Sequence, residues 1–382
     1  MPHSSKNEQE ELALDPARQE KARKYASAKR LSTLAELALA GIFLLVLVFS
    51  GLSIKFGELL TLPTVPTAAI YFVGLTAVYG ILSAPLSYYS SFVLPHRYGL
   101  SIQKFGSWLA DTAKAWMLGL IAGTGIVAAA YWFLSSFPAT WWLLTWGVVV
   151  VLILILSSLA PLIIFPLFVK MKPLDDNELK LKLEELAQQA NTSVRGIYTM
   201  ELGSKATSAY AALMGLGNTK RIALSDTLLQ RYSSPEIEVV MAHELGHNRH
   251  NDIFRMFIIE SAILLVGFYV INLVLKSVVT PLGFNGISDA AALPLLLLIF
   301  ATLSLVTAPL TNAYSRHLEA VADDYALRLT KNPGAFINLI TKLTDQNLSE
   351  AKPSRWVELL TYDHPCYSKR IRHARYYSTK EK

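Results

Sequence analysis

Two histidines and a glutamate near the middle of the chain have the types and spacing of a hydrolytic metal site. In His243-Glu244-Leu245-Gly246-His247 the histidines are four residues apart, so on a helix both imidazoles lie on one face and can bind one metal ion. Zinc in hydrolytic sites takes three protein ligands and, when bound, brings the pKa of water toward neutrality. The pattern predicts that His243 and His247 bind zinc and that Glu244 activates water. An accidental match is expected in about one chain of this length in a hundred.

The third metal ligand must come from another part of the chain. Glu319 and Asp323 are also four residues apart, in a stretch that continues the last apolar run as a helix. We expect Glu319 to bind the zinc, with one Zn²⁺ per chain. Asp323 is expected to accept a hydrogen bond from the imidazole N–H that faces away from the metal. Taken alone, this stretch is equally typical of a solvated helix, and the histidine motif is what favours the metal interpretation.

The composition indicates a protein that crosses a membrane several times. Of 382 residues, 52% are hydrophobic, and the mean hydropathy of +0.36 comes from long apolar runs. Each run can cross a hydrocarbon core of about 30 Å. The six runs cover residues 34–54, 67–93, 113–137, 141–169, 257–279 and 290–310.

The distribution of Lys and Arg predicts which parts face the cytoplasm. Nearly all of them fall in 1–33, 94–112, 170–255 and 312–382, whereas the other loops hold Lys55, with Lys276 close by. Both termini and the polar middle region are therefore expected on the cytoplasmic side. The net charge of +6 is explained by this anchoring, and no nucleic-acid partner is expected. Polar residues 1–30 predict no cleavable signal peptide, and the single Cys366 allows no internal disulfide.

The region between the fourth and fifth runs predicts a small α+β domain. Residues 177–190 have the leucine spacing of an amphipathic helix, and 205–214 and 221–224 have the pattern of strands joined by a turn at 215–218. Ser234, before Pro235, is the expected cap of the metal-binding helix. The predicted fold class is a mainly α membrane protein of about six transmembrane helices with a cytoplasmic α+β, zincin-like domain.

The domain organisation follows from the same pattern. We expect a basic N-terminal segment, four spans with their loops, the α+β domain ending in the metal-binding helix, two further spans, and a C-terminal region that carries the third ligand. The expected ranges are 1–33, 34–169, 170–255, 256–311 and 312–382.

Several stretches resemble the membrane-embedded M48 metalloproteases, specifically the Ste24-type CAAX prenyl proteases and their prokaryotic relatives. The resemblance runs from about Leu86 to Arg372. The stretches that carry it are 85–93 with His96-Arg97-Tyr98-Gly99-Leu100, Pro166-Leu167-Phe168 with Lys170 and Pro173-Leu174, 220–229 leading into the histidine motif, and Asn312-Ala313-Tyr314-Ser315-Arg316-His317-Leu318-Glu319 through Asp323.

The resemblance implies further site residues. His364-Pro365 and Arg370-Ile371 resemble the C-terminal elements of the family, so His364 is expected to stabilise the oxyanion that forms on the scissile carbonyl. Without the resemblance, a histidine before a proline in a polar region, such as His364, is more typical of a surface loop. The residues expected to orient the ligands or the substrate are Asp323, Arg370, Arg316 and Asn312. His250 and His317 are not expected to be ligands.

The chain also departs from the family pattern. The eukaryotic enzymes have seven spans around an intramembrane chamber, and this chain shows six, with the most N-terminal one missing. The strand that binds substrate often reads Ser-Asn-Ala-Tyr in the family. Here the expected substrate strand reads Thr207-Ser208-Ala209-Tyr210, which lacks the asparagine.

The leading hypothesis is a zinc endopeptidase that cleaves membrane-associated or prenylated CAAX-type peptides at the cytoplasmic face. Its expected partners are the bilayer and peptide or protein substrates, including lipidated ones. Its expected place is the inner cell membrane of a prokaryote or the endoplasmic reticulum membrane of a eukaryote. One alternative is an M48 protease for membrane-protein quality control without prenyl specificity. Another is a transporter or receptor with a structural zinc site, which Glu244 disfavours because such a site needs no carboxylate between its histidines.

Overall fold

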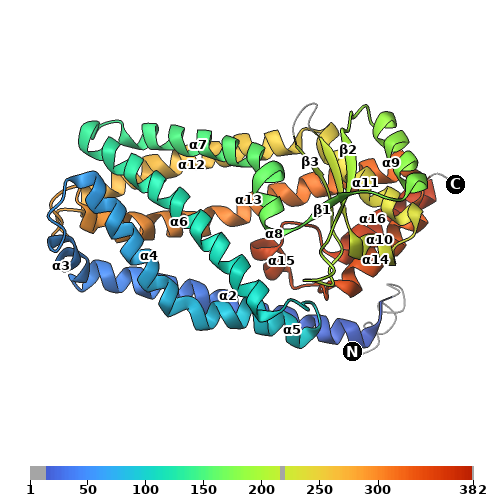
Figure 1. Cartoon of the computed structure of the whole chain (residues 1–382), viewed down its shortest axis with the longest axis horizontal. Coiled ribbons are helices and arrows are strands. Elements are labelled where there is room, and N and C mark those ends of the chain that lie inside the picture. Colours follow the sequence, from blue (N-terminus) through green and yellow to red (C-terminus); the bar gives the residue numbers. More distant parts are fainter. Residues whose placement is uncertain (1–13, 216–219, 381–382) are drawn as a thin grey trace.

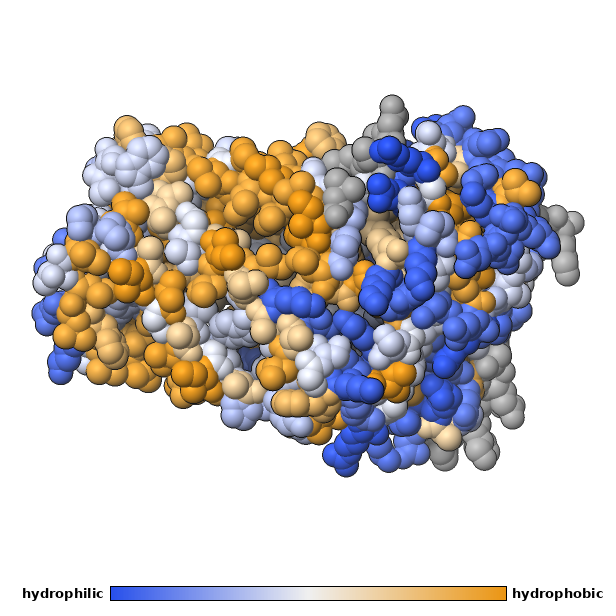
Figure 2. All heavy atoms as spheres, in the orientation of Figure 1, coloured by the Kyte–Doolittle hydropathy of each residue, from blue (hydrophilic) through white to orange (hydrophobic). Residues whose placement is uncertain are grey.

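The computed structural model describes residues 14–215 and 220–380, and it has two parts (Figure 1). Long helices form one part, and a mixed domain of strands and shorter helices lies at one end of them. On the face seen in Figure 2, apolar side chains predominate over the helical part and polar side chains predominate over the domain. Residues 1–13 of the predicted basic segment and most of the predicted turn at 215–218 lie outside the described residues.

Six helices in the described part of the chain are long and apolar enough to cross a membrane, which confirms the six predicted spans. The first is α2 (Pro16–Phe49), followed by the short α3 (Leu52–Glu58). The other five are α4 (Thr64–Tyr88), α6 (Phe105–Ser136), α7 (Trp141–Leu159), α12 (Asp252–Val278) and α13 (Leu293–Thr330). Short segments extend three of them. α4 continues into η1 (Tyr89–Val93) and α5 (Leu94–Tyr98), α7 continues into η2 (Ala160–Ile164) and α8 (Phe165–Phe168), and η4 (Ala290–Ala292) precedes α13.

The domain contains a four-stranded sheet in the order β1-β2-β4-β3. β1 (Met171–Pro173) pairs antiparallel with β2 (Gly196–Met200), and β2 pairs parallel with β4 (Arg221–Ser225). β3 (Ala211–Met214) pairs antiparallel with β4 and forms one edge of the sheet. The remaining domain helices are α9 (Asn177–Gln189), α10 (Asp226–Arg231), α11 (Ser234–Arg249), α14 (Pro333–Gln346), α15 (Arg355–Thr361) and α16 (Tyr367–Lys380).

One hydrophobic core joins the two separately predicted polar regions of the chain. Leu183 of α9, Leu224 of β4 and Leu245 of α11 are fully buried together with Phe336 of α14 and Ile371 of α16. Burial of such apolar side chains is the main driving force that holds the domain together, at roughly 1.5–3 kcal/mol for each one. The C-terminal region is therefore part of the same domain as the sheet, rather than a separate unit.

Three predicted boundaries fall inside continuous helices. α2 runs through the boundary after residue 33, α12 runs through the one after residue 255, and α13 runs through the one after residue 311. The polar start of α2 lies against the domain, where Arg18 donates to the Asp345 carbonyl and Arg30 pairs with Glu350 at 2.8 Å. The end of an apolar run shows where a helix leaves the bilayer. The helix itself can continue into the polar region when its side chains pack against the rest of the protein.

Two local predictions need correction. The predicted strand 205–214 is a strand only from Ala211, because the main chain of Lys205 and Thr207 bonds instead to the loop between α5 and α6. The cap of α11 is Ser233 rather than Ser234. Its N–H donates to the Glu236 carboxylate at 2.8 Å, in a capping box that satisfies a main-chain donor at the start of the helix.

Candidate active site

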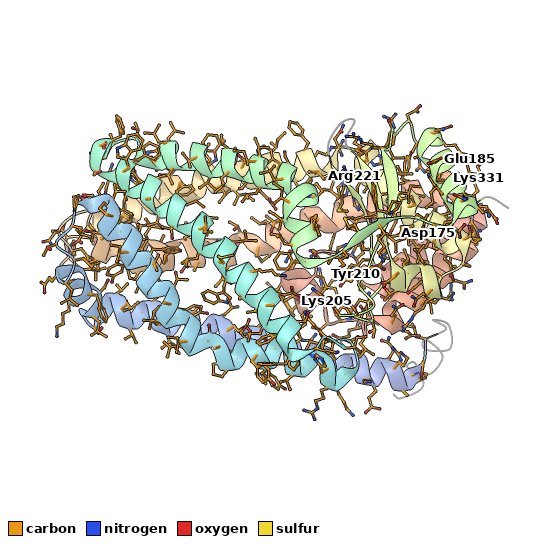
Figure 3. All side chains as sticks on the ribbon, viewed as in Figure 1. Asp175, Glu185, Lys205, Tyr210, Arg221 and Lys331 are labelled. Carbon is orange, nitrogen blue, oxygen red and sulfur yellow. The ribbon has the colours of Figure 1, made fainter. Side chains whose placement is uncertain are left out.

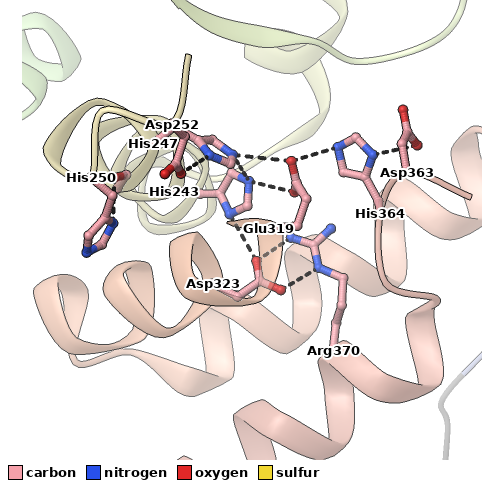
Figure 4. A network of polar contacts seen from close by, with 10 residues as sticks. His243, His247, His250, Asp252, Glu319, Asp323, Asp363, His364 and Arg370 are labelled. Carbon is pink, nitrogen blue, oxygen red and sulfur yellow. Dashed lines mark hydrogen bonds and ion pairs between the residues drawn. The ribbon is translucent and has the colours of Figure 1, made fainter. Parts of the chain in front are cut away.

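The site forms where α11 crosses α13. The helices approach closely because residue 246 is glycine: a Cβ there would lie 3.2 Å from the Cα of Ala322 and from the Cβ of Tyr325. The start of α11 is also fixed to α14, because Glu236 pairs with Lys342 at 2.7 Å. The crossing therefore places residues from two distant parts of the sequence next to each other (Figure 4).

Three side chains from the two helices direct ligand atoms at one point. His243, His247 and Glu319 each offer one ligand atom, and these atoms lie within 4.8 Å of one another. The Nε2 atoms of the two histidines are 3.1 Å apart, and the Glu319 oxygens lie 3.2 and 3.3 Å from them (Figure 4). Oε2 of Glu319 is buried and makes no hydrogen bond. Two imidazoles and a carboxylate with converging lone pairs are a donor set that suits a divalent cation such as zinc.

Carboxylates behind the two imidazoles fix their orientation. Nδ1 of His243 lies 2.9 Å from Asp323, and Nδ1 of His247 lies 2.9 Å from Asp252. Each ring therefore turns its Nε2 toward the ligand centre, as in many metal sites where the second nitrogen meets a carboxylate. Arg370 donates to both Asp323 oxygens, from Nε at 2.8 Å and from the second guanidinium nitrogen at 2.5 Å. This arrangement places Asp323 and Arg370 where they can orient His243.

Asp252 is absent from the sequence-based set of site residues. It follows His247 by five residues, a spacing that does not bring two side chains together on one helix. The contact exists because Asn251 adopts a left-handed conformation with φ of 55°, which ends α11 and starts α12 at Asp252. The available signal was the Asn251-Asp252 pair, a typical turn and helix-start sequence.

The charges around the ligand centre favour a cation. Burial lowers the pKa of His243, but Asp323 and Glu319 outweigh it and raise that pKa above its ordinary value. The same carboxylates would attract a metal ion in place of the proton, so metal binding and protonation compete at this site.

Glu244 lies next to the ligand centre without belonging to the ligand group. The main-chain N–H of Leu213 in the edge strand β3 lies close enough to the Glu244 carboxylate to lower its pKa, so this carboxylate faces the strand. Burial raises the pKa of Glu244 above its ordinary value, which makes the carboxylate a stronger base. A carboxylate between the metal ligands and a free sheet edge is well placed to exchange protons with a molecule bound there.

His364 reaches the site from the C-terminal part of the domain. Its Nε2 lies 3.2 Å from Glu319 and its Nδ1 lies 2.8 Å from Asp363 (Figure 4). The His364 side chain is 54% exposed, so it sits on the solvent side of the more buried Glu319. The interpretation of His364 as an ordinary surface-loop histidine therefore does not explain its contact with Glu319.

Asn312 and Arg316 hydrogen-bond to main-chain carbonyls of the C-terminal region. Asn312 donates to the Leu360 carbonyl at 3.0 Å, and Arg316 donates to the carbonyls of Glu358 and Tyr362. Both side chains thus fasten the segment that leads to His364 onto α13. Among the described residues, the ligand group includes neither His250 nor His317.

The expected substrate residues Ser208, Ala209 and Tyr210 lie just before β3. The Ser208 carbonyl accepts from Thr227, Ala209 is buried, and both main-chain groups of Tyr210 bond to Ser225. Hydrogen-bonding direction alternates along an antiparallel strand, so the groups of Ala212 also face β4. The groups of Ala211 and Leu213 are the ones on the open edge.

The six apolar helices and a domain with a His-Glu-x-x-His helix and a third carboxylate ligand define the class of membrane-embedded metalloproteases. The chain belongs to peptidase family M48, whose sequence model matches residues 173–378. A second model, described as the CAAX prenyl protease N-terminal part with five membrane helices, matches residues 3–170, where the described part of this chain has four candidate spans. Family membership implies a metal ion and makes the chain a multi-pass integral membrane protein.

Individual relatives show the same similarity. An uncharacterized metalloprotease of Bacillus subtilis, YhfN, is 34% identical over 72% of this chain and 66% of its own length. A probable CAAX prenyl protease 1 of Schizosaccharomyces pombe is 28% identical over 80% of this chain and 65% of its own length. This chain thus spans about two thirds of the length of these two relatives. The crystal structure of S. mikatae Ste24p is similar over 94% of this chain and 90% of that one, with a TM-score of 0.82 and 26% identity.

We predict that Gly246→Val lowers metal content. The added side chain would push α11 away from Ala322 and separate the histidines from Glu319. Elemental analysis of the purified variant should show well under half of the wild-type metal, with Gly246→Ala intermediate. Gly267→Val in α12, where a Cβ would meet nothing within 4 Å, is the matched control and should retain full metal content. A fully loaded Gly246→Val protein would show that the helix contact does not set the ligand geometry.

Proposed function

We propose that this protein is a zinc-dependent endopeptidase that hydrolyses peptide bonds of membrane-associated substrates. The observation that carries the proposal is the convergence of His243, His247 and Glu319 beside Glu244, which faces an open sheet edge. Zinc fits two imidazoles and one carboxylate, since hydrolytic zinc sites use three such ligands. A structural zinc site usually has four protein ligands. Among the described residues, the ligand group has three members.

The proposed chemistry divides between the ion and two side chains. Bound zinc would supply a Lewis acid that makes water nucleophilic at neutral pH. Glu244 accepts the proton of the attacking water and passes it to the leaving amine, for which its raised pKa is suited. His364 donates a hydrogen bond to the oxygen of the scissile carbonyl as negative charge develops on it. Asp323, Arg370 and Asp252 keep the imidazoles oriented.

The substrate main chain is expected to bind along β3. The open-edge N–H and carbonyl of Ala211 and the carbonyl of Leu213 can pair with an extended peptide, and such pairing tolerates many side chains. Because the Leu213 N–H faces Glu244, a peptide on this edge lies beside the base. This assignment moves the substrate-binding groups from Ser208, Ala209 and Tyr210 to the strand that follows them.

The proposed substrate class is the prenylated C-terminal peptide. Relatives from fission yeast and rice are named CAAX prenyl protease 1, and the similarity to Ste24p spans nearly the whole chain. The membrane helices beside the site give a lipid-modified peptide an apolar environment. Cleavage of unprenylated membrane proteins, as in quality control, is the competing outcome of the experiment below.

Glu244→Gln should abolish hydrolysis while retaining one zinc per chain. The amide keeps the shape of the side chain but cannot accept the proton, so turnover should fall by at least about 10³-fold. Purified protein is incubated with a farnesylated C-terminal peptide and an unprenylated copy, and products are followed by mass spectrometry. Glu238→Gln on the same helix is the control and should behave as wild type. Near-normal turnover of Glu244→Gln would overturn the mechanism, and equal cleavage of both peptides would remove the prenyl specificity.

His364→Ala should lower kcat with little change in KM. A donor that acts on the oxyanion contributes mainly in the transition state, and losing one such donor typically costs about 10²–10³ in turnover. Zinc content should stay at one per chain, because His364 lies outside the ligand group. The exposed His317 provides the control variant His317→Ala. Loss of zinc in His364→Ala would make His364 a ligand, and unchanged kcat would return it to a surface role.

We propose that the domain faces the cytoplasm, on the basis of the Lys and Arg distribution. In a Cys366→Ser background, a cysteine at Lys180 in α9 should be protected from an impermeant thiol reagent added to intact cells. A cysteine at Lys55 in α3, at the opposite end of the molecule, should be labelled (Figure 1). The reverse pattern would invert the orientation.

A further inference from the structure

A cluster of polar side chains joins the third membrane helix to the segment that leads into β3. At its centre, Asp111 of α6 accepts hydrogen bonds from Lys205 at 2.5 Å, Gln103 at 2.7 Å and Lys114 at 3.2 Å. Lys205 also donates to the Phe168 carbonyl at 2.7 Å, and Lys114 donates to the carbonyl of Leu167 at 2.9 Å. The cluster therefore connects α6, the end of α8 and the start of the segment that leads into β3.

The environment of the cluster distinguishes it from an ordinary surface ion pair. The Lys205 and Asp111 side chains are 25% and 19% exposed. Exposed single pairs contribute little because water screens them and their long side chains lose freedom. Here one carboxylate meets two ammonium groups, and each ammonium group also meets a main-chain carbonyl, so the geometry of Lys205 is fixed from several sides.

The main chain around Lys205 is held as well. The N–H of Ile102 donates to the Lys205 carbonyl at 3.1 Å, and the N–H of Thr207 donates to the Leu100 carbonyl at 3.2 Å. These bonds make a short antiparallel pairing between the α5–α6 loop and the segment, with a bridge between Ser101 and Ala206. The interactions that replace the predicted strand at 205–210 thus attach this segment to the membrane part.

This attachment restricts the position of β3, because β3 begins only four residues after Thr207. β4 holds one side of β3, and the other side is the open edge facing Glu244. Figure 3 shows Lys205 and Tyr210 between α6 and the sheet. We propose that Lys205 and Asp111 are positioning residues, which fix the open edge of β3 relative to the metal ligands and thereby couple α6 to peptide binding. The proposal rests on the proposed peptidase function and on β3 as the substrate-binding edge.

The test compares KM with kcat for the zinc-loaded full-length protein. Lys205→Met removes the ammonium group, and Asp111→Asn removes the charge while keeping the side-chain shape. Each should raise KM for a farnesylated peptide of about ten residues by about tenfold, with kcat within about threefold of wild type and one zinc per chain. Lys205→Arg should restore most of the affinity. If the two residues act as one unit, the double variant should be no worse than Lys205→Met.

The matched control is Lys172→Met, on the opposite edge strand β1, where Lys172 pairs with Glu201. It removes a lysine ion pair from the same sheet and should leave KM unchanged. An unchanged KM in Lys205→Met, or the same increase in Lys172→Met, would overturn the proposal. If Lys205→Met loses zinc or fails to fold, Asp111→Asn decides, and a wild-type KM in that variant would overturn it. Failure of the wild-type protein to cleave any peptide would instead refute the proposed function.

Discussion

Where α11 crosses α13, Gly246 lies against the main chain of Ala322, and a larger residue at this position would force the helices apart. The ligand set is divided between these helices, with two imidazoles on α11 and the carboxylate of Glu319 on α13. The separation of the helices at the crossing therefore determines whether the three ligand atoms converge. The capping box of α11, the ion pair between Glu236 and Lys342, and the shared hydrophobic core all keep this crossing in place.

The polar residues around the crossing have separate tasks. Asp323 and Asp252 orient the imidazoles, and Arg370 satisfies the buried Asp323, which would otherwise be costly to keep charged away from water. Asn312 and Arg316 hold main-chain carbonyls of the segment that leads to His364. The family pattern suggests an influence of these two residues on the site, and their hydrogen bonds are made to that segment.

The parts of the site that sequence could predict are those set by helical spacing. His243 with His247, and Glu319 with Asp323, each lie on one helix, and the apolar runs predict the spans from length alone. Asp252 could not be found this way, because its contact needs a left-handed residue between two helices. The predicted start of β3 is misplaced because the main chain of residues 205–207 pairs with a loop between two membrane helices. Pairing across such a distance in sequence leaves no local pattern.

α13 is a single helix of 38 residues, about 57 Å long at the usual helical rise, with Glu319 near one end and apolar membrane-spanning residues along the other. Glu319 and the membrane-spanning residues thus lie on one helix, on either side of Pro309. A change in bilayer thickness that shifted or tilted this helix would therefore move the Glu319 carboxylate relative to imidazoles held on another helix. Metal–ligand distances in well-formed sites lie within about 0.2 Å of their usual values. The thickness of the host membrane, which its lipid composition sets, would thus affect the distance between Glu319 and the two histidines through hydrophobic mismatch with α13.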